Sequence, residues 1–143
     1  MHLIDANILV YVHREDAPQH SDYFEWFSDL AQSDQPFAIT DLIFSGFLRV
    51  VTHQRIFAPP SPMAAALAFA NDLRNHPNCV SIAPGKRHWD IFTKLCREAN
   101  TRGNLIPDAY LAALAIESGS DLVTADRDFS RFPGLRVVYP LMG

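Results

Sequence analysis

The sequence predicts an α/β fold in which helices enclose a mainly parallel central sheet of about five strands. Short apolar runs alternate along the chain with longer segments whose apolar residues recur at helical spacing. Aspartates stand directly after two of the short runs, at Asp5 and Asp126, where a strand would end and a turn would begin. Such alternation is typical of a parallel sheet with helices on both faces.

The predicted strands are short and apolar, and turn-forming residues separate them from the helices. The first ends at Asp5, and the second, Phe37-Ala38-Ile39, follows a polar loop. Pro84-Gly85 ends the third. The predicted strands cover residues 1–5, 37–39, 79–82, 122–124 and 135–138.

Six helices are predicted from apolar spacing and from capping residues. Ser21 is expected to cap the second helix, and Thr40 or Asp41 the third. Ser61 followed by Pro62 resembles a cap with proline in the first turn of the fourth. A loop over residues 100–106 precedes the sixth, which Asp108 begins. The predicted helices cover residues 6–15, 22–31, 42–53, 64–73, 88–99 and 108–116.

Length and composition favour a single domain over residues 1–143. The chain has 143 residues, 48% of them hydrophobic, which suffices for one packed core. The net charge of -4 lacks the basic bias of many nucleic-acid-binding domains, although metal-binding aspartates would account for part of it. Cys79 and Cys96 are too widely spaced for a zinc site and are predicted to be reduced, buried thiols. Without a leader or membrane-spanning run, we expect a cytoplasmic protein that does not enter membranes.

Four aspartates are the candidate catalytic residues: Asp5, Asp108, Asp126 and Asp128. In parallel sheets, ligands bind outside the carboxyl ends of the strands, and these four residues are expected to gather there. Each alone has a structural explanation, because aspartate caps helices and favours their positive ends. Gathered carboxylates, however, repel one another unless a cation neutralises them, and hard divalent ions prefer oxygen ligands. The sequence therefore predicts a magnesium-dependent hydrolytic site.

Other hydrolytic sites receive little support from the sequence. The six histidines show no HExxH or HxH spacing, and no GxxxxGK[ST] loop is present. An aspartyl-nucleophile phosphatase would require a second aspartate two residues after Asp5, where this chain has Asn7. Asn7 is instead placed to orient Asp5 or to contact the metal.

Three motifs together resemble the PIN-domain ribonucleases, and among them the VapC toxins of type II toxin–antitoxin systems. The motifs are Leu3-Ile4-Asp5-Ala6-Asn7-Ile8-Leu9, the run from Ile106-Pro107-Asp108 to Ala115, and Val123-Thr124-Ala125-Asp126-Arg127-Asp128-Phe129. The resemblance covers nearly the whole chain, and the three motifs in this order are strongly specific. Residues 46–52 and 85–89 resemble a subgroup common in mycobacteria.

The resemblance implies a PIN-like three-layer α/β/α sandwich and a magnesium-dependent endoribonuclease that cuts structured RNA, either tRNA or ribosomal RNA. It makes Asp5, Asp108 and Asp126 the metal ligands and Asp128 a neighbouring acid, with Mn²⁺ able to replace Mg²⁺. It also implies a cognate VapB-like antitoxin that blocks the site, and a homodimer.

One position departs from the family pattern. The glutamate that the family usually carries in the helix after the second strand is Gly46 here. Three explanations remain open: Asp41 supplies the missing carboxylate, the four aspartates suffice, or the site is weakened. We favour the second explanation. A weakened PIN module that acts only by binding RNA or a partner is the alternative function, and a phosphatase or DNA nuclease is a third.

Two sets of residues are candidates for binding RNA and the antitoxin. Arginine pairs bidentately with phosphate, although most surface arginines are simply solvated, and Arg127 is placed to pair with its flanking aspartates. On the helix predicted over residues 22–31, Tyr23, Trp26 and Phe27 are expected to help bind the antitoxin. The candidate RNA-binding cations are Arg14, Arg49, Arg55, Lys86, Arg87, Arg127 and Arg131.

Overall fold

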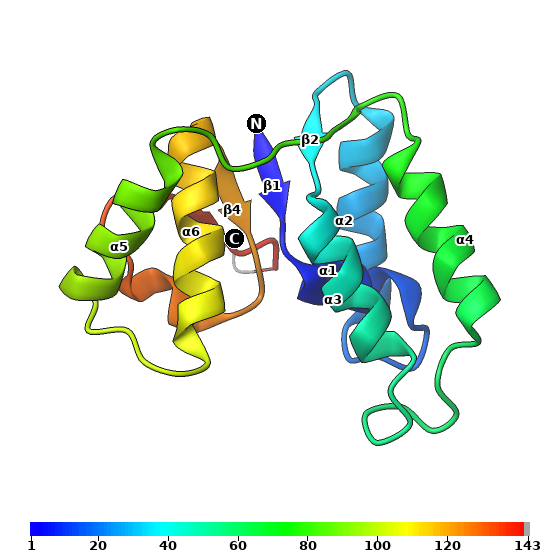
Figure 1. Ribbon diagram of the computed structural model, residues 1–143. Helices are drawn as coiled ribbons and strands as arrows, with labels where there is room; N and C mark the ends of the chain where they lie inside the picture. Colours follow the sequence, from blue (N-terminus) through cyan, green and yellow to red (C-terminus); the bar gives the residue numbers. More distant parts are fainter. Residues whose placement is uncertain (142–143) are drawn as a thin grey trace.

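The computed structural model describes residues 1–141, and a sheet of five strands lies at its centre (Figure 1). The strand order is β3-β2-β1-β4-β5, and every neighbouring pair is parallel. The predicted α/β class and five-stranded parallel sheet are confirmed. Both edge strands are shorter than predicted, since residues 81–82 and 135–136 leave the sheet. The strands are β1 (His2–Ile4), β2 (Phe37–Ala38), β3 (Cys79–Val80), β4 (Asp121–Val123) and β5 (Val137–Val138).

In the described part of the chain, six α-helices and one 3-10 helix surround the sheet. In Figure 1, α5 and α6 lie together on one side of β1 and β4, and α2, α3 and α4 lie on the other. Helix α1 packs against both α2 and α3. The helices are α1 (Ala6–His13), α2 (His20–Gln32), α3 (Asp41–Val51), α4 (Met63–Arg74), α5 (His88–Glu98), α6 (Leu105–Ser118) and the 3-10 helix η1 (Arg127–Arg131).

The core is built around the two central strands. Leu3 and Ile4 of β1 and Leu122 and Val123 of β4 are fully buried. Burial on both faces explains why these strands read as continuous apolar runs rather than as alternating ones. Helix α6 presents small buried side chains to this core, among them Ala109, Ala112, Ala113 and Ala115, which allow it to pack close to the sheet.

Helix α6 begins at Leu105, three residues before its predicted start. Pro107 therefore lies inside the first turn, where the N–H that it lacks would have no partner within the helix. The predicted loop was too long because proline was taken as a boundary. Gly119 ends the helix in the left-handed conformation, with φ of 69°, as glycine readily does.

The capping predictions were right for one helix and wrong for two. The Thr40 hydroxyl accepts a hydrogen bond from the Ile43 N–H at 3.1 Å, as expected for the cap of α3. Helix α2 begins after Gln19, rather than after Ser21. Helix α4 begins after Pro62, and the buried Ser61 hydroxyl instead lies 2.9 Å from Nε2 of His13. Ser61 thereby ties the end of α1 to the loop before α4.

Two further expectations concern the cysteines and the membrane. Cys79 and Cys96 are both free thiols, and each is partly buried. Within residues 1–141, none of the helices combines the length and the apolar character needed to cross a bilayer.

Candidate active site

Strand pairing fixes Asp5 at the carboxyl edge of the sheet. Asp5 follows β1, and its N–H donates to the carbonyl oxygen of Val123, the last residue of the adjacent strand β4, at 2.9 Å. It also precedes α1, and its Oδ1 accepts from the Ala6 N–H at 2.7 Å. Asp5 is therefore both a helix cap and a carboxylate at the strand edge, so that the structural role expected of it does not exclude a functional one.

The buried hydroxyl of Thr124 is the centre of a hydrogen-bond network around Asp5. It donates to Oδ2 of Asp5 at 2.8 Å, and accepts from the Asn7 amide at 3.2 Å and from the Asp126 N–H at 3.1 Å. The Asn7 amide also reaches Oδ2 of Asp5 at 3.3 Å, while its oxygen accepts from the Ala125 N–H at 3.2 Å. These bonds hold the ends of β1 and β4 in one arrangement, and the bond from Asn7 to Asp5 is the one expected of a residue that orients this carboxylate.

The prediction of site residues missed Thr124. Its signal in the sequence was a hydroxyl residue at the end of an apolar strand, two positions before Asp126. Threonine is common in strands, and only the pairing of β1 with β4 brings it to Asp5.

Asp126 and Asp128 lie at the start of η1. Oδ1 of Asp126 accepts from the Asp128 N–H at 2.9 Å, so Asp126 caps this short helix. Oδ1 of Asp128 lies 3.5 Å from Nη2 of Arg131. The Arg127 guanidinium lies over the Tyr139 ring, 5.5 Å from its centroid, and the Tyr139 hydroxyl donates to the Asp126 carbonyl oxygen at 3.4 Å.

Asp108, in the first turn of α6, lies within electrostatic range of the other three acids. Burial raises its pKa, and the negative charges of Asp126, Asp5 and Asp128 raise it further, to about 6, while Arg131 acts in the opposite direction. Burial also raises the pKa of Asp5, against the hydrogen bonds from Thr124 and Ala6. The structure thus brings together all four aspartates that the sequence singled out.

The four carboxylates form a dispersed cluster. In the described part of the chain, no three or more His, Cys, Asp or Glu side chains are placed closely enough to hold a metal ion by themselves. The negative charges of Asp126, Asp5 and Asp128 all disfavour the charged form of Asp108 and so raise its pKa.

Gly46 and Asp41 occupy different surroundings on α3. A Cβ built at Gly46 would lie 3.8 Å from the Ala6 Cβ, an ordinary contact, so this position faces the start of α1 beside Asp5. The Asp41 carboxylate instead accepts from Nε of Arg74 on α4 at 2.8 Å, and this bond lowers its pKa. Asp41 therefore has a partner away from the four acids.

Several predicted binding residues are engaged within the protein. Tyr23 and Phe27 belong to the buried core, so the prediction that they contact an antitoxin was wrong; Trp26 is partly buried and Phe24 is 51% exposed. The helical spacing that placed these rings on one helix did not distinguish a core face from an exposed face. Arg14 is also engaged, since its Nη2 lies 2.6 Å from Oδ2 of Asp16.

Comparison with known proteins identifies the class to which this site belongs. A model of the PIN domain matches residues 2–135. Ribonuclease VapC25 of Mycobacterium tuberculosis is 44% identical over 140 residues, which are 98% of this chain and 99% of the relative. VapC ribonuclease Mb2897 of Mycobacterium bovis is 40% identical over 140 residues, which are 98% and 95% of the two chains. The chain belongs to the PIN-domain family.

Solved structures share the fold at low sequence identity. VapBC2 from Rickettsia felis, bound to a DNA fragment from its promoter, superimposes with a TM-score of 0.71 at 18% identity, covering 96% of each chain. The sarcin–ricin loop cleaving toxin VapC20 of Mycobacterium tuberculosis gives 0.66 at 13% identity, covering 95% of this chain and 99% of that one. The predicted PIN fold is confirmed, and the relatives support the predicted class, a type II toxin with endoribonuclease activity.

Proposed function

We propose that this chain, a single PIN domain over residues 1–143, is a toxin that cleaves structured RNA, either tRNA or ribosomal RNA, in a magnesium-dependent reaction. One observation carries the proposal. Asp5, Asp108, Asp126 and Asp128 gather at one edge of the sheet, and their charges, together with burial, raise the pKa of Asp108 to about 6. An arrangement that costs folding free energy in the absence of a cation is typical of a functional site.

The donor atoms fit a hard divalent cation. PIN-domain nucleases generally use divalent metal ions, and the side chains here offer carboxylate oxygens. Mg²⁺ keeps several waters and is usually held by only one or two carboxylates, which is compatible with a dispersed cluster. Asp5, Asp108 and Asp126 are the carboxylates that would hold Mg²⁺, or Mn²⁺ in its place, with one or two of them in direct contact and waters completing the coordination. When bound, the ion supplies a water of lowered pKa and stabilises negative charge on a phosphoryl oxygen.

The residues around the acids position them for this task. The Thr124 hydroxyl and the Asn7 amide fix Asp5, so that its orientation is set before substrate arrives. Arg131 is the cation whose charge acts on Asp108, and its guanidinium suits a phosphate oxygen of the substrate.

We propose that the four aspartates suffice without an acid at position 46. The pairing of Asp41 with Arg74 supports this over compensation by Asp41. Cleavage by an Asp41→Ala variant should match that of the wild-type protein. Loss of cleavage in a folded Asp41→Ala variant would instead make Asp41 the missing ligand.

A VapB-like antitoxin, a homodimer and a cytoplasmic location complete the proposal. The class of the relatives supports the antitoxin, and α2 offers two aromatic side chains, Phe24, which is 51% exposed, and Trp26, which is partly buried. Phe24→Ala and Trp26→Ala should weaken antitoxin binding in a titration of purified components. Unchanged affinity in both variants would move the antitoxin contact away from α2.

Matched RNA and DNA strands provide the direct test of the proposed activity. The wild-type protein should cleave the RNA strand and leave the DNA strand intact. Asp108→Asn should abolish cleavage, whereas Asp34→Asn, which removes the same charge from an exposed loop, should retain it. Cleavage of DNA alone would refute the proposal.

The absence of a carboxylate at Gly46 favours one second candidate, a weakened module that acts by binding RNA or a partner. This candidate predicts RNA binding without cleavage in the presence of Mg²⁺. A Gly46→Glu variant that gains cleavage would support it.

A further inference from the structure

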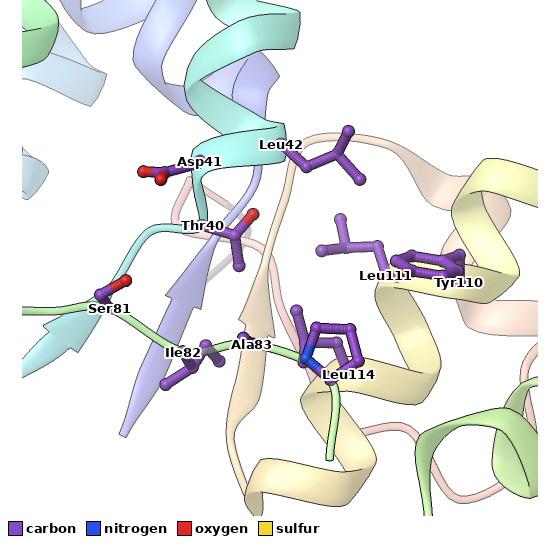
Figure 2. Close-up of a pocket in the computed structure, with 10 residues that line it drawn as sticks. Thr40, Asp41, Leu42, Ser81, Ile82, Ala83, Tyr110, Leu111 and Leu114 are labelled. Atoms are coloured by element: carbon purple, nitrogen blue, oxygen red, sulfur yellow. The ribbon is translucent and has the colours of Figure 1, made fainter. Parts of the chain in front are cut away.

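A cleft between helices α3 and α6 plays no part in the acid site described above. Its volume is about 320 Å³, and it lies between the start of α3, the loop after β3 and the middle of α6 (Figure 2). The lining is mainly apolar, and its polar side chains are the hydroxyl groups of Thr40, Ser81 and Tyr110 and the carboxylate of Asp41. The residues that matter here are Thr40, Leu42, Ile82, Tyr110, Leu111 and Leu114.

Leu42 is the unusual member of this lining. It lies in the first turn of α3 and is 62% exposed. In Figure 2 its side chain extends toward Leu111 across the gap between the two helices. Because Leu42 exposes apolar surface to water at the mouth of an apolar cleft, covering it with a ligand would contribute favourably to the free energy of binding.

The opposite wall is rigid. The Tyr110 ring packs against His88, with 4.4 Å between the ring centroids, and against Phe92, with 5.6 Å. The His88 ring is buried, and its Nε2 lies 2.9 Å from the Tyr110 carbonyl oxygen. Because His88 and Phe92 already restrict the Tyr110 ring, binding of a planar ligand against this ring costs little conformational entropy.

Helical spacing places the cleft next to the acid cluster. Leu111 follows Asp108 by three residues, so both lie on one face of α6, about 4.5 Å apart along its axis. On α3, Gly46 follows Leu42 by four residues and faces the start of α1 beside Asp5. Leu42 and Gly46 thus lie one helical turn apart on α3, as Leu111 and Asp108 do on α6.

We propose that this cleft is a nucleobase subsite, which receives the unstacked base of a nucleotide adjoining the scissile phosphate. The inference rests on the proposed cleavage of RNA and names the part of the chain that selects the nucleotide. A base has apolar faces and a polar edge, which match the walls formed by Leu42, Leu111 and Tyr110 and the hydroxyls of Thr40 and Tyr110.

The size of the cleft favours a base over a protein partner. A stable protein interface covers about 800 Å² on each side, and a bound helix requires a row of apolar pockets. A hollow of about 320 Å³ is at the small end of ligand pockets and holds one ring system. Its position one helical turn from Asp108 also matches the short distance between a phosphate and the base of the same nucleotide.

The test combines a protein variant with a missing base. A short RNA that the wild-type protein cleaves is compared with versions that carry an abasic nucleotide on either side of the scissile phosphate. For the wild-type protein, one of the two abasic RNAs should raise KM about tenfold and leave kcat within about twofold. Leu42→Ala should raise KM for the intact RNA about five- to tenfold. In this variant, replacing the intact RNA with the same abasic RNA should raise KM by less than a further factor of about two.

Leu67→Ala on α4 is the matched control, because Leu67 is also an exposed leucine, at 41%, and lies outside the cleft lining. It should behave like the wild-type protein with every RNA. Tyr110→Phe, which removes only the hydroxyl, should change the preference among bases while preserving the abasic effect.

Independent effects of the abasic nucleotide and of Leu42→Ala on KM would overturn the inference. So would unchanged RNA kinetics together with weaker antitoxin binding by Leu42→Ala, a result that assigns the cleft to the protein partner. Failure of the wild-type protein to cleave any RNA would refute the proposed function, and the subsite with it, before the variants are compared.

Discussion

Replacement of Asp108 by asparagine should stabilise the metal-free protein at neutral pH and have a smaller effect in acid. The pKa of Asp108 is raised from 3.8 to about 6, because burial and three neighbouring carboxylates disfavour its charged form. A carboxyl group with a raised pKa contributes stability below its unfolded-state pKa, and this contribution is lost as the pH rises through the folded-state pKa. The wild-type protein therefore loses stability, relative to the variant, between about pH 4 and pH 7.

The magnitude follows from the shift. About two pKa units, at about 1.4 kcal/mol each, give an upper bound of about 3 kcal/mol. Because Asp108 is partly exposed, solvent screening reduces the expected difference to about 1–2 kcal/mol. Asparagine has nearly the same shape without the charge, so packing is conserved.

Urea denaturation in EDTA, followed by tryptophan fluorescence between about pH 4 and pH 8, measures this difference. The free energy of unfolding of Asp108→Asn, minus that of the wild-type protein, should rise across this range. The control Asp34→Asn, which carries the same substitution in an exposed loop, should show a flat difference. A flat or falling curve for Asp108→Asn would refute the reasoning that the four carboxylates repel one another in the folded protein.

Three other predictions concern the metal, Gly46 and the hydrogen bonds of the Thr124 hydroxyl. Mg²⁺ at a hundredfold excess over its Kd should stabilise the wild-type protein by about 2.7 kcal/mol, which is measured as a rise in melting temperature. This stabilisation should be absent in Asp108→Asn. An equal rise in both proteins would contradict binding of Mg²⁺ at these carboxylates. Gly46→Ala should increase stability by about 0.5–1 kcal/mol in chemical denaturation, since the added Cβ meets only Ala6 at 3.8 Å, and cleavage should stay unchanged; lower stability would mean that the space is needed. Thr124→Val should cost about 1–3 kcal/mol and reduce cleavage, because it leaves the partners of the buried hydroxyl unsatisfied, while Thr124→Ser should retain both; wild-type behaviour of the valine variant would remove Thr124 from the site.

The sequence predicted most of the fold because its strands and helices carry clear local signals. Short apolar runs such as Leu3-Ile4 and Leu122-Val123 are buried on both faces, and their positions fixed those of Asp5 and Asp126. Boundaries were predicted less well. Pro107 was taken as the end of a loop, although a proline is tolerated in the first turn of a helix.

What the sequence did not predict depends on contacts between distant residues. Thr124 reaches Asp5 across 119 positions, and Arg74 reaches Asp41 across 33. The burial of Tyr23 and the exposure of Phe24, which are neighbours in sequence, follow from which face of α2 meets α1. Helical spacing alone predicts that aromatic side chains share one side of a helix. The packing of neighbouring elements determines which side of the helix is buried and which is exposed.

Cleavage of total tRNA and ribosomal RNA by the purified, antitoxin-free protein distinguishes a magnesium-dependent ribonuclease from a module that only binds RNA. The reaction is run with Mg²⁺, with EDTA, and with Asp108→Asn as the paired variant. We expect discrete fragments that require Mg²⁺ and that disappear in the variant. Intact RNA after incubation of the folded wild-type protein with Mg²⁺, or equal fragmentation by Asp108→Asn, would contradict this expectation.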